Sequence, residues 1–372
     1  MSIKVSTPSR ICIFGEHQDY LGLEVIAQAI DLRFYAEADE REDKILDIEI
    51  GSKRFNKPKE EPYQWINHRV DFSKNLVYEN NRDYMKSIVN VLFKKGYALR
   101  KGYNIKMISE IPIGKGMCSS STMIVALIKL LLECIDSEDK DNPEKIAYLG
   151  YLAEVEEFKE PGGMMDHYAS ALGNMVNLDF KDSSTKAYKI QNNLPGNFIL
   201  FDSLKDKKTT EVLATAKIPV VEGLKKLNKY GIYSIKDFIK DKENLRYIDE
   251  LEDIEKRNML ANIDNYKILQ QGKEMLNSKN FSPQKFGALI KRHHENLRDG
   301  LQISTKEIED ILNTAYSYGA LGGKINGSGG GGCCYVYAMD NNCNDILAAV
   351  EQLGYPGRIV KCAQGVRREE EL

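Results

Sequence analysis

The chain has 372 residues, of which 29% are charged and 42% hydrophobic, and its formal net charge is −3. This length exceeds that of a typical single core, so we expect two domains. A nearly neutral, slightly acidic chain gives no electrostatic basis for binding nucleic acid or an anionic membrane surface.

We expect a cytoplasmic protein. Its first residues lack the apolar core of a signal peptide, and its longest apolar run, within 123–132, is too short to cross a bilayer. The seven cysteines are odd in number and show no CxxC spacing. This pattern predicts neither a disulfide framework nor a zinc site, and we expect the cysteines to pack as small apolar residues.

The first 38 residues contain two apolar β-forming runs, RICIF and LEVIAQAIDLRFYAEA, on either side of the polar segment GEHQDYLG. Both runs predict buried strands. The polar segment is rich in carboxylate and imidazole groups, which accept hydrogen bonds from the hydroxyls of a polyhydroxylated ligand. A solvated hairpin turn is the alternative. The residues able to bind such a ligand are Glu16, His17, Asp19 and Tyr20.

From residue 39 to residue 82 the chain is charged and irregular, with weak strand signals in ILDIEIG and LVYEN. Its single tryptophan, Trp65, is expected to be a packing residue. An amphipathic helix is predicted over 83–95, because apolar residues recur there at helical spacing. The strand GYNIKMISE follows.

The stretch 111–134, IPIGKGMCSSSTMIVALIKLLLEC, joins a glycine-containing loop to an apolar helix. The first N–H groups of a helix lack intrahelical partners and lie at the positive end of its dipole, so they can bind phosphate. Gly114 and Gly116 allow close approach to the backbone. The alternative is an ordinary N-capped core helix. Three serines can cap the helix, donate to phosphate or hold a metal: Ser119, Ser120 and Ser121.

Beyond this helix, Pro143 opens another, which carries Glu154 and two further glutamates. A solvated helix face is the usual place for such charges. The sequence KEPGGMMDHYASALGN follows, and Asp166 opens its helix, where an aspartate can cap the helix or take part in chemistry. Capping is the usual role of an isolated aspartate there. Strands are predicted over 175–179 and 198–202.

The segment KDKKTT, 205–210, could meet phosphate, but we interpret it as a charged loop. Helices are predicted over 211–280 and 283–300. The glycine-rich stretch ALGGKINGSGGGGCCYVYA contains a GxGxxG match, yet a β-forming run follows where a dinucleotide-binding unit requires a helix. Its backbone can still wrap closely around another group. The tail VRREEEL is expected to fray.

Three of these stretches, taken in order, resemble motifs of the GHMP kinase superfamily, and most closely those of its galactokinase group. The segment SRICIFGEHQDYLGLEVIAQAID is similar to the galactokinase signature GRxNxxGEHxDYxxGxVLPxAI. The segment PIGKGMCSSSTM resembles the family's phosphate loop, PxxxGLxSSAA, and GGKINGSGGGGC resembles its C-terminal loop, GAKLSGAGxGGC. The segments AEVEEFKEPGGMMDHYAS and HHENLRDGLQISTKEI resemble further galactokinase motifs.

The resemblance implies a two-domain α+β fold. The expected domains are a ribosomal-protein-S5-like N-terminal domain over 1–190 and a ferredoxin-like C-terminal domain over 191–372, with the active site in the cleft between them. It implies transfer of the γ-phosphoryl group of ATP, with Mg²⁺, to the anomeric hydroxyl of an aldose, with galactose as the expected substrate. The expected partners are therefore sugar and ATP, bound by a monomer or a weak homodimer.

The family's functional residues map onto this sequence as follows. Asp166 matches the catalytic aspartate, and Arg10 matches the arginine that pairs with it. Ser120 and Glu154 match the Mg²⁺ ligands. The sugar ligands correspond to Glu16, His17 and Asp19, with Tyr20 beside them. The phosphate loop comprises Gly114, Lys115, Gly116, Cys118, Ser119, Ser120 and Ser121, and the C-terminal glycine loop comprises Gly327, Ser328, Gly329 and Gly330.

The sequence departs from the galactokinase pattern at Ser9, at Cys118, at the Ser121–Thr122 pair and at His167, which stands where a glutamine is usual. None of these changes removes a catalytic group. They leave open another acceptor within the family, such as arabinose, glucuronate, a heptose phosphate or mevalonate, although GEHQDY argues against the last two. A non-catalytic sugar sensor is a further alternative, but the expected catalytic set is complete.

Overall fold

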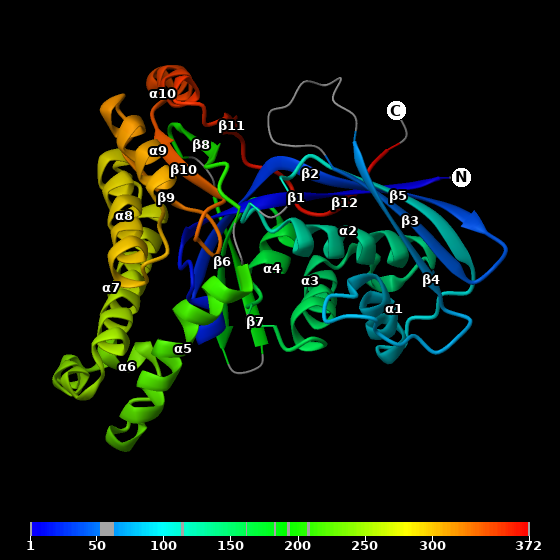
Figure 1. The fold of residues 1–372 in the computed structure, drawn as a ribbon, viewed down its shortest axis with the longest axis horizontal. Helices are drawn as coiled ribbons and strands as arrows, with labels where there is room; N and C mark the ends of the chain where they lie inside the picture. Colours follow the sequence, from blue (N-terminus) through cyan, green and yellow to red (C-terminus); the bar gives the residue numbers. More distant parts are fainter. Residues whose placement is uncertain are drawn as a thin grey trace.

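The computed structural model describes residues 2–52, 63–112, 115–160, 162–181, 184–191, 194–206 and 209–370. Its strands form an eight-stranded sheet and a four-stranded sheet. Figure 1 shows an elongated molecule with the larger sheet and helices α1 to α4 in one half, and the smaller sheet with helices α7 to α10 in the other. The architecture is therefore a mixture of helix and sheet in two parts.

The larger sheet has the order β12-β1-β2-β5-β3-β4, and β6 and β7 extend it beside β2. Its neighbouring strands are antiparallel except β3 and β5, which are parallel. The strands are β1 (Ile3–Phe14), β2 (Val25–Arg41), β3 (Ile45–Ser52), β4 (Gln64–Asp71), β5 (Gly102–Ser109), β6 (Met175–Lys181), β7 (Ser184–Ile190) and β12 (Arg367–Arg368).

The helix α2 is the centre of this half. It contacts β1 and β2 on one side and α3 and α4 on the other. Residues 124–132 are all buried, because apolar side chains surround the helix and its one charged member there, Lys129, is paired with Glu133 at 2.6 Å. The helices of this half are α1 (Tyr84–Lys94), α2 (Ser119–Cys134), α3 (Pro143–Tyr151) and α4 (Met165–Leu172).

The smaller sheet is antiparallel, with the order β11-β8-β10-β9. Its strands are β8 (Asn197–Asp202), β9 (Gly322–Ile325), β10 (Cys333–Ala338) and β11 (Gly357–Val360). The helices of this part of the chain are α5 (Thr209–Leu227), α6 (Ile235–Lys240), α7 (Asp253–Leu276), α8 (Pro283–Glu295), α9 (Lys306–Ser317) and α10 (Asp340–Gln352).

The two halves share hydrophobic contacts where they meet. Phe14 at the end of β1 packs edge to face against Phe286 of α8, with ring centroids 5.6 Å apart. The same core cluster includes Tyr335 and Tyr337 of β10. A domain boundary near residue 190 remains a proposal, since the core is continuous across the junction.

The structure corrects two expectations from the sequence, a strand in LVYEN and a frayed C-terminal tail. A strand lies at Gln64–Asp71 and none lies in 76–80, where Val77 is 70% exposed. Trp65 is 43% exposed but is a packing residue, since its ring lies against Gly51 of β3 and the Lys106 ammonium lies 5.3 Å from a ring centre. The C-terminal tail is not frayed over β12, which pairs with β1.

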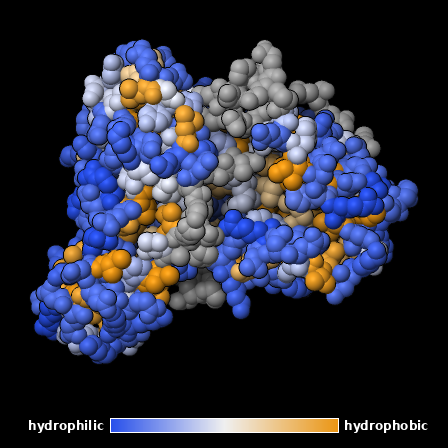
Figure 2. Space-filling model, viewed as in Figure 1, coloured by the Kyte–Doolittle hydropathy of each residue, from blue (hydrophilic) through white to orange (hydrophobic). Residues whose placement is uncertain are grey.

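Figure 2 shows a surface that is largely hydrophilic on this face, with hydrophobic residues in small patches. Among the residues that the structure describes, no helix is long and apolar enough to cross a membrane.

Replacement of Gly173 by alanine tests how the C-terminal segment packs on the first half. A Cβ atom at Gly173 would lie 1.9 Å from the backbone nitrogen of Gly365, and its φ is +69°. We expect the variant to lose more than about 2 kcal/mol of unfolding free energy, because backbone must shift. Gly354→Ala is the control: its φ is +91° but nothing lies within 4 Å. Equal losses in urea unfolding would contradict the packing.

Candidate active site

A cavity of about 300 Å³ lies at the junction of the two halves. Segments that are distant in sequence line it, among them β1 and the loop after it, the start of α2, the segment 154–163 that leads to the start of α4, and the glycine loop after β9. The predicted site residues that line it are Arg10, Glu16, His17, Asp19, Tyr20, Gly116, Cys118, Ser119, Ser120, Ser121, Glu154, Asp166, Gly327 and Ser328.

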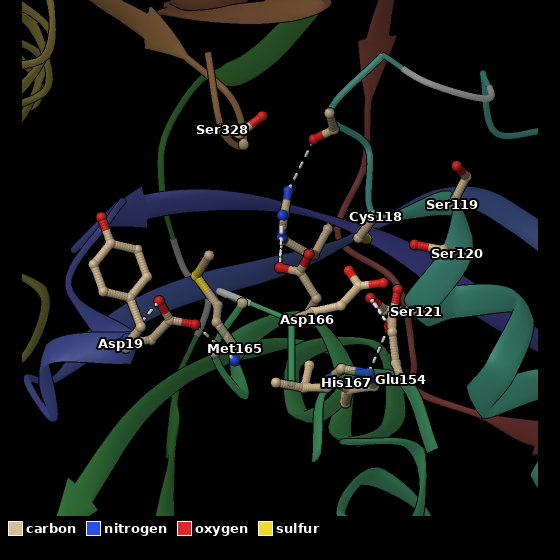
Figure 3. A pocket seen from close by; sticks show the side chains of 18 of the residues that line it. Asp19, Cys118, Ser119, Ser120, Ser121, Glu154, Met165, Asp166, His167 and Ser328 are labelled. Atoms are coloured by element: carbon tan, nitrogen blue, oxygen red, sulfur yellow. Dashed lines mark hydrogen bonds and ion pairs between the residues drawn. The ribbon is translucent and has the colours of Figure 1, made fainter. Parts of the chain in front are cut away.

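Arg10 and Asp166 both line this cavity and form an ion pair, and Figure 3 shows how Asp166 lies in it. Arginine Nε and Nη2 both donate to Oδ1 of Asp166, at 2.8 and 2.6 Å. Burial opposes the charged form of Arg10, but the Asp166 carboxylate raises its pKa above the ordinary value. The arginine side chain is 3% exposed, whereas that of Asp166 is 28% exposed. The pair therefore presents a carboxylate, not a guanidinium, to the cavity.

Asp166 does not cap α4, whose N-cap residue is Met164. The carboxylate oxygen Oδ2 of Asp166 makes no hydrogen bond with any of the described residues. It is thus available to accept a proton or a hydrogen bond from a ligand hydroxyl. The structure therefore excludes the helix-capping role that is usual for an isolated aspartate at the position of Asp166.

The N-terminus of α2 opens into the same cavity. Its N-cap residue, Cys118, has left-handed backbone with φ 48° and makes no side-chain cap hydrogen bond. The first-turn residues line the cavity and their N–H groups have no side-chain cap, so an anion bound there can satisfy them. Burial raises the pKa of the Cys118 thiol, so it remains a neutral packing group.

Glu154 is held in place beside this helix (Figure 3). Its Oε2 accepts hydrogen bonds from Ser121 Oγ at 2.6 Å and from His167 Nε2 at 2.7 Å. Burial alone would raise the pKa of Glu154, but the hydrogen bond from His167 and those from the serines lower it. Glu154 is therefore an anion in a fixed orientation, not a solvated charge on a helix face.

The residues present fit a magnesium ion. Ser120 and Glu154 both line the cavity and offer only oxygen, the donor that Mg²⁺ prefers. No cluster of three or more His, Cys, Asp or Glu side chains suited to a metal occurs in the part of the chain that the structure describes. An ion here would thus have few protein ligands and would depend on phosphate oxygens and water, as is usual for Mg²⁺ at nucleotide sites.

The loop after β1 forms the opposite wall. Oε2 of Glu16 is paired with the Lys324 ammonium at 2.7 Å. His17 uses both ring nitrogens, with Tyr20 Oη at 2.9 Å and the Ser328 carbonyl at 3.0 Å. Because a carbonyl only accepts, the Nε2 atom carries the proton. In this arrangement His17 links the loop to the glycine loop, and its role as a sugar ligand remains a prediction.

Asp19 accepts backbone hydrogen bonds from Tyr20 at 2.9 Å and from Met165 at 3.2 Å. Burial, together with the nearby Asp166 carboxylate, raises the pKa of Asp19 to about 6. Two carboxylates, Asp19 and Asp166, thus approach the same space. Such a pair is expected where hydroxyl groups of a ligand supply hydrogen bonds.

The glycine loop lies directly against the phosphate loop. A Cβ atom at Gly327 would lie 2.6 Å from the carbonyl oxygen of Gly116, and one at Gly332 would lie 2.5 Å from that of Lys115. Both glycines have positive φ, so no other residue fits without strain. Gly329 and Gly330 pack against Ile303 and Val212 instead of lining the cavity. The glycines thus serve close approach between two loops.

The rest of the predicted phosphate loop and the segment 205–210 contribute no side chain to the cavity among the described residues. Lys115 pairs with Asp206 at 2.9 Å and lies 3.8 Å from Asp202, so its ammonium faces carboxylates rather than the cavity. Gly114 lies outside the described residues, as do two lysines of the segment 205–210. Lys205 pairs with Glu307 at 3.3 Å, in accord with a charged loop.

Sequence reasoning did not single out Lys324 or Asn326, which are fully buried behind the site. Asn326 accepts from the backbone N–H of Cys12 at 3.0 Å and donates to the carbonyl of Gly116 at 3.2 Å. It therefore ties β1 to the phosphate loop. The sequence did contain a hint of their role. Lys324 and Asn326 are long polar residues within the otherwise glycine-rich segment GGKINGSGGGGC.

Three family models match the chain. The GHMP kinases N terminal domain matches residues 83–174, the GHMP kinases C terminal matches residues 276–355, and the galactokinase galactose-binding signature matches residues 3–39. These matches include the loop after β1, the phosphate loop, Asp166 and the glycine loop. The chain belongs to the GHMP kinase family. Its architecture is the two-domain GHMP kinase fold, as the sequence predicted.

Relatives of this GHMP kinase include two kinds of enzyme. A galactokinase of Clostridium perfringens is 27% identical over 356 residues, which cover 93% of this chain and 88% of the relative. A mevalonate kinase of Thermococcus sibiricus is 26% identical, covering 100% of this chain and 99% of the relative. The GHMP kinase is thus galactokinase-like at modest identity.

Solved structures agree on the fold. The structure of Lactococcus lactis galactokinase complexed with galactose superposes with a TM-score of 0.78 at 21% identity, covering 99% of this chain and 95% of that one. The mevalonate kinase of Methanococcus jannaschii gives a TM-score of 0.70 at 21% identity, covering 98% of this chain and 99% of that one.

The raised pKa of Asp19 predicts that Asp19→Asn stabilises the fold at alkaline pH. Because the native pKa of about 6 lies above the ordinary value of about 3.9, the native state binds this proton more tightly than the unfolded state does. Ionised Asp19 therefore costs stability above pH 6. We expect a gain of ~1 kcal/mol at pH 8 that shrinks toward pH 4, measured by urea unfolding.

The exposed Asp249, which pairs with Lys256 away from the cavity, provides the control for this prediction. Asp249→Asn is expected to change stability by less than about 0.5 kcal/mol at either pH. A gain in Asp19→Asn that is absent at pH 8, or larger in acid, would contradict the assigned environment of Asp19.

Proposed function

We propose that this protein is a sugar 1-kinase that transfers the γ-phosphoryl group of ATP to the anomeric hydroxyl of galactose. The observation that carries the proposal is the Arg10–Asp166 pair, which offers a fixed carboxylate midway between an uncapped helix N-terminus and a polar loop. One of these neighbours suits phosphate and the other suits hydroxyl groups. Phosphoryl transfer to an alcohol requires a phosphate-binding element and a hydroxyl-binding element beside the same carboxylate.

The acceptor side rests on the loop after β1. Glu16 and Asp19 supply carboxylate oxygens at the cavity wall, and Tyr20 lies beside them. This loop falls within the match to the galactokinase galactose-binding signature, residues 3–39. A wall of hydrogen-bond acceptors favours a polyhydroxylated substrate and rejects analogues that lack its hydroxyl groups.

In the proposed reaction, Oδ2 of Asp166 orients the acceptor hydroxyl and takes its proton. The acceptor oxygen bonds to the γ-phosphorus as the bond from that phosphorus to the β–γ bridging oxygen breaks, and ADP leaves. Arg10 holds Oδ1, which fixes the orientation of the carboxylate. The same guanidinium donates to the Gly116 carbonyl at 3.2 Å. Arg10 therefore holds the Asp166 carboxylate and the phosphate loop at a fixed distance from each other. Such positioning supplies much of the rate enhancement in phosphoryl transfer.

The nucleotide side rests on the first turn of α2, whose N–H groups and serines bind the phosphates in this proposal. Ser120 and Glu154 would hold Mg²⁺, with His167 and Ser121 fixing the orientation of Glu154. When bound, Mg²⁺ neutralises charge on the phosphates during transfer.

Mevalonate is the second candidate acceptor, because the mevalonate kinase of Thermococcus sibiricus aligns with all of this chain. Mevalonate has a carboxylate and few hydroxyl groups. At this wall Glu16 and Asp166 are each paired with a cation, whereas the Asp19 carboxylate has none among the described residues and repels a carboxylate ligand. On this ground galactose is the better match.

Asp166→Asn tests the proposed chemistry. The amide keeps the shape of the side chain but neither accepts a proton nor neutralises Arg10, so we expect kcat with galactose and MgATP to fall by about 10²–10⁴-fold. The KM for galactose should change little, because the polar wall is intact. The measurement is ADP release in a coupled assay.

A matched control for this variant is Asp264→Asn, which disrupts an arginine–aspartate pair on the surface, with Arg292, outside the cavity. Its turnover should equal that of the wild type. Unchanged turnover in Asp166→Asn would refute the catalytic assignment of this aspartate.

A further inference from the structure

The most deeply buried charged side chain near the site belongs to Lys324 of β9, which is 0% exposed. Its ammonium donates to Glu16 Oε2 at 2.7 Å, to the Ile325 carbonyl at 2.7 Å and to the Cys12 carbonyl at 3.0 Å. A buried ammonium is retained only when its three donors are satisfied, as they are here. Two of its three partners belong to the other half of the molecule.

Lys324 does not line the cavity, whereas Glu16 does. The lysine lies behind the carboxylate and has no route to a bound ligand except through Glu16. Burial alone would raise the pKa of Glu16, but the neighbouring Lys324 and Arg10 charges lower it. The carboxylate at the wall is therefore ionised because of these cations.

The same ammonium also fixes the position of the loop that carries Glu16. The Cys12 carbonyl belongs to the end of β1, and the chain turns at Gly15, which has φ +94° and lies against Glu24 and Val25. One lysine thus holds both the strand that enters the loop and the first carboxylate within it. Removing the ammonium frees the Glu16 side chain in a region where a displacement of about 1 Å is costly to binding.

We propose that Lys324 is a positioning residue for the acceptor: from β9 it holds the Glu16 carboxylate in the orientation that binds the acceptor's hydroxyl groups. This inference rests on the proposed function, since it assumes a hydroxylated acceptor at the Glu16 wall. Both halves of the molecule then contribute to the acceptor site. The residues predicted to contact the acceptor all lie in the first half, and Lys324 of the second half holds one of them in place.

The test compares Lys324→Met with the wild type by steady-state kinetics with galactose and MgATP. The expected result is a KM for galactose raised by about 10-fold or more, corresponding to loss of one charge-assisted hydrogen bond, with the KM for ATP nearly unchanged. A KM for galactose that stays within about twofold of the wild type in a folded variant would overturn the proposal.

Two further variants separate positioning from a merely structural role. The first is the double variant Glu16→Gln/Lys324→Met. Lys324→Met alone leaves the buried Glu16 carboxylate without its cation, whereas the double variant has no such unpaired charge to destabilise the fold. If Lys324 acts through Glu16, this double variant has the same KM for galactose as Glu16→Gln alone. Additive losses, or equal losses for galactose and ATP, would instead indicate general damage and would overturn the proposal.

Lys129→Met is the matched control, because Lys129 is a second buried lysine, 2% exposed and paired with Glu133, far along α2 from the cavity. It should lower the unfolding temperature without changing either KM. Absence of turnover in the wild-type protein with any acceptor would count against the proposed function. An active wild type with unaltered kinetics in Lys324→Met would count against this inference alone.

Discussion

The buried ion pair between Arg10 and Asp166 is the interaction on which the rest of the site depends. A guanidinium that is 3% exposed requires a carboxylate partner, so β1 and the start of α4 must meet at this point. The same arginine reaches the Gly116 carbonyl and thereby sets the phosphate loop. Chain segments 156 residues apart are joined by one side chain. The pair thus determines the geometry of the site and also holds the first half together.

A second constraint is close contact between the halves. The glycine loop touches the phosphate loop at backbone distances that exclude any Cβ at Gly327. Next to it, Lys324 and Asn326 reach into the first half and satisfy groups of β1 and its loop. The smaller sheet is therefore not only a cover for the cavity. It supplies the buried polar contacts that keep both walls in position.

Much of this arrangement could be predicted from the sequence, because its motifs are local. Periodicity located α1, the apolar run after the three serines located α2, and the motif order indicated the family and the fold. What the sequence could not give was pairing between distant segments. Taken one at a time, Asp166 reads as a helix cap and Glu154 as a solvated charge, and only the family resemblance gave them other roles. Their contacts with Arg10, Ser121 and His167 came from the structure. The sequence predicted a frayed tail in place of β12, because its charged residues have no strand pattern of their own and form a strand by pairing with β1.

In the proposed function, this site phosphorylates the anomeric oxygen of a sugar. The direct test is to incubate the wild-type protein with MgATP and, separately, galactose, N-acetylgalactosamine, glucuronate, arabinose, fucose and mevalonate, and to identify products by phosphorus and carbon NMR. The expected main product is galactose with phosphate on its anomeric carbon. Phosphorylation of mevalonate alone, or of a sugar at another carbon, would contradict it.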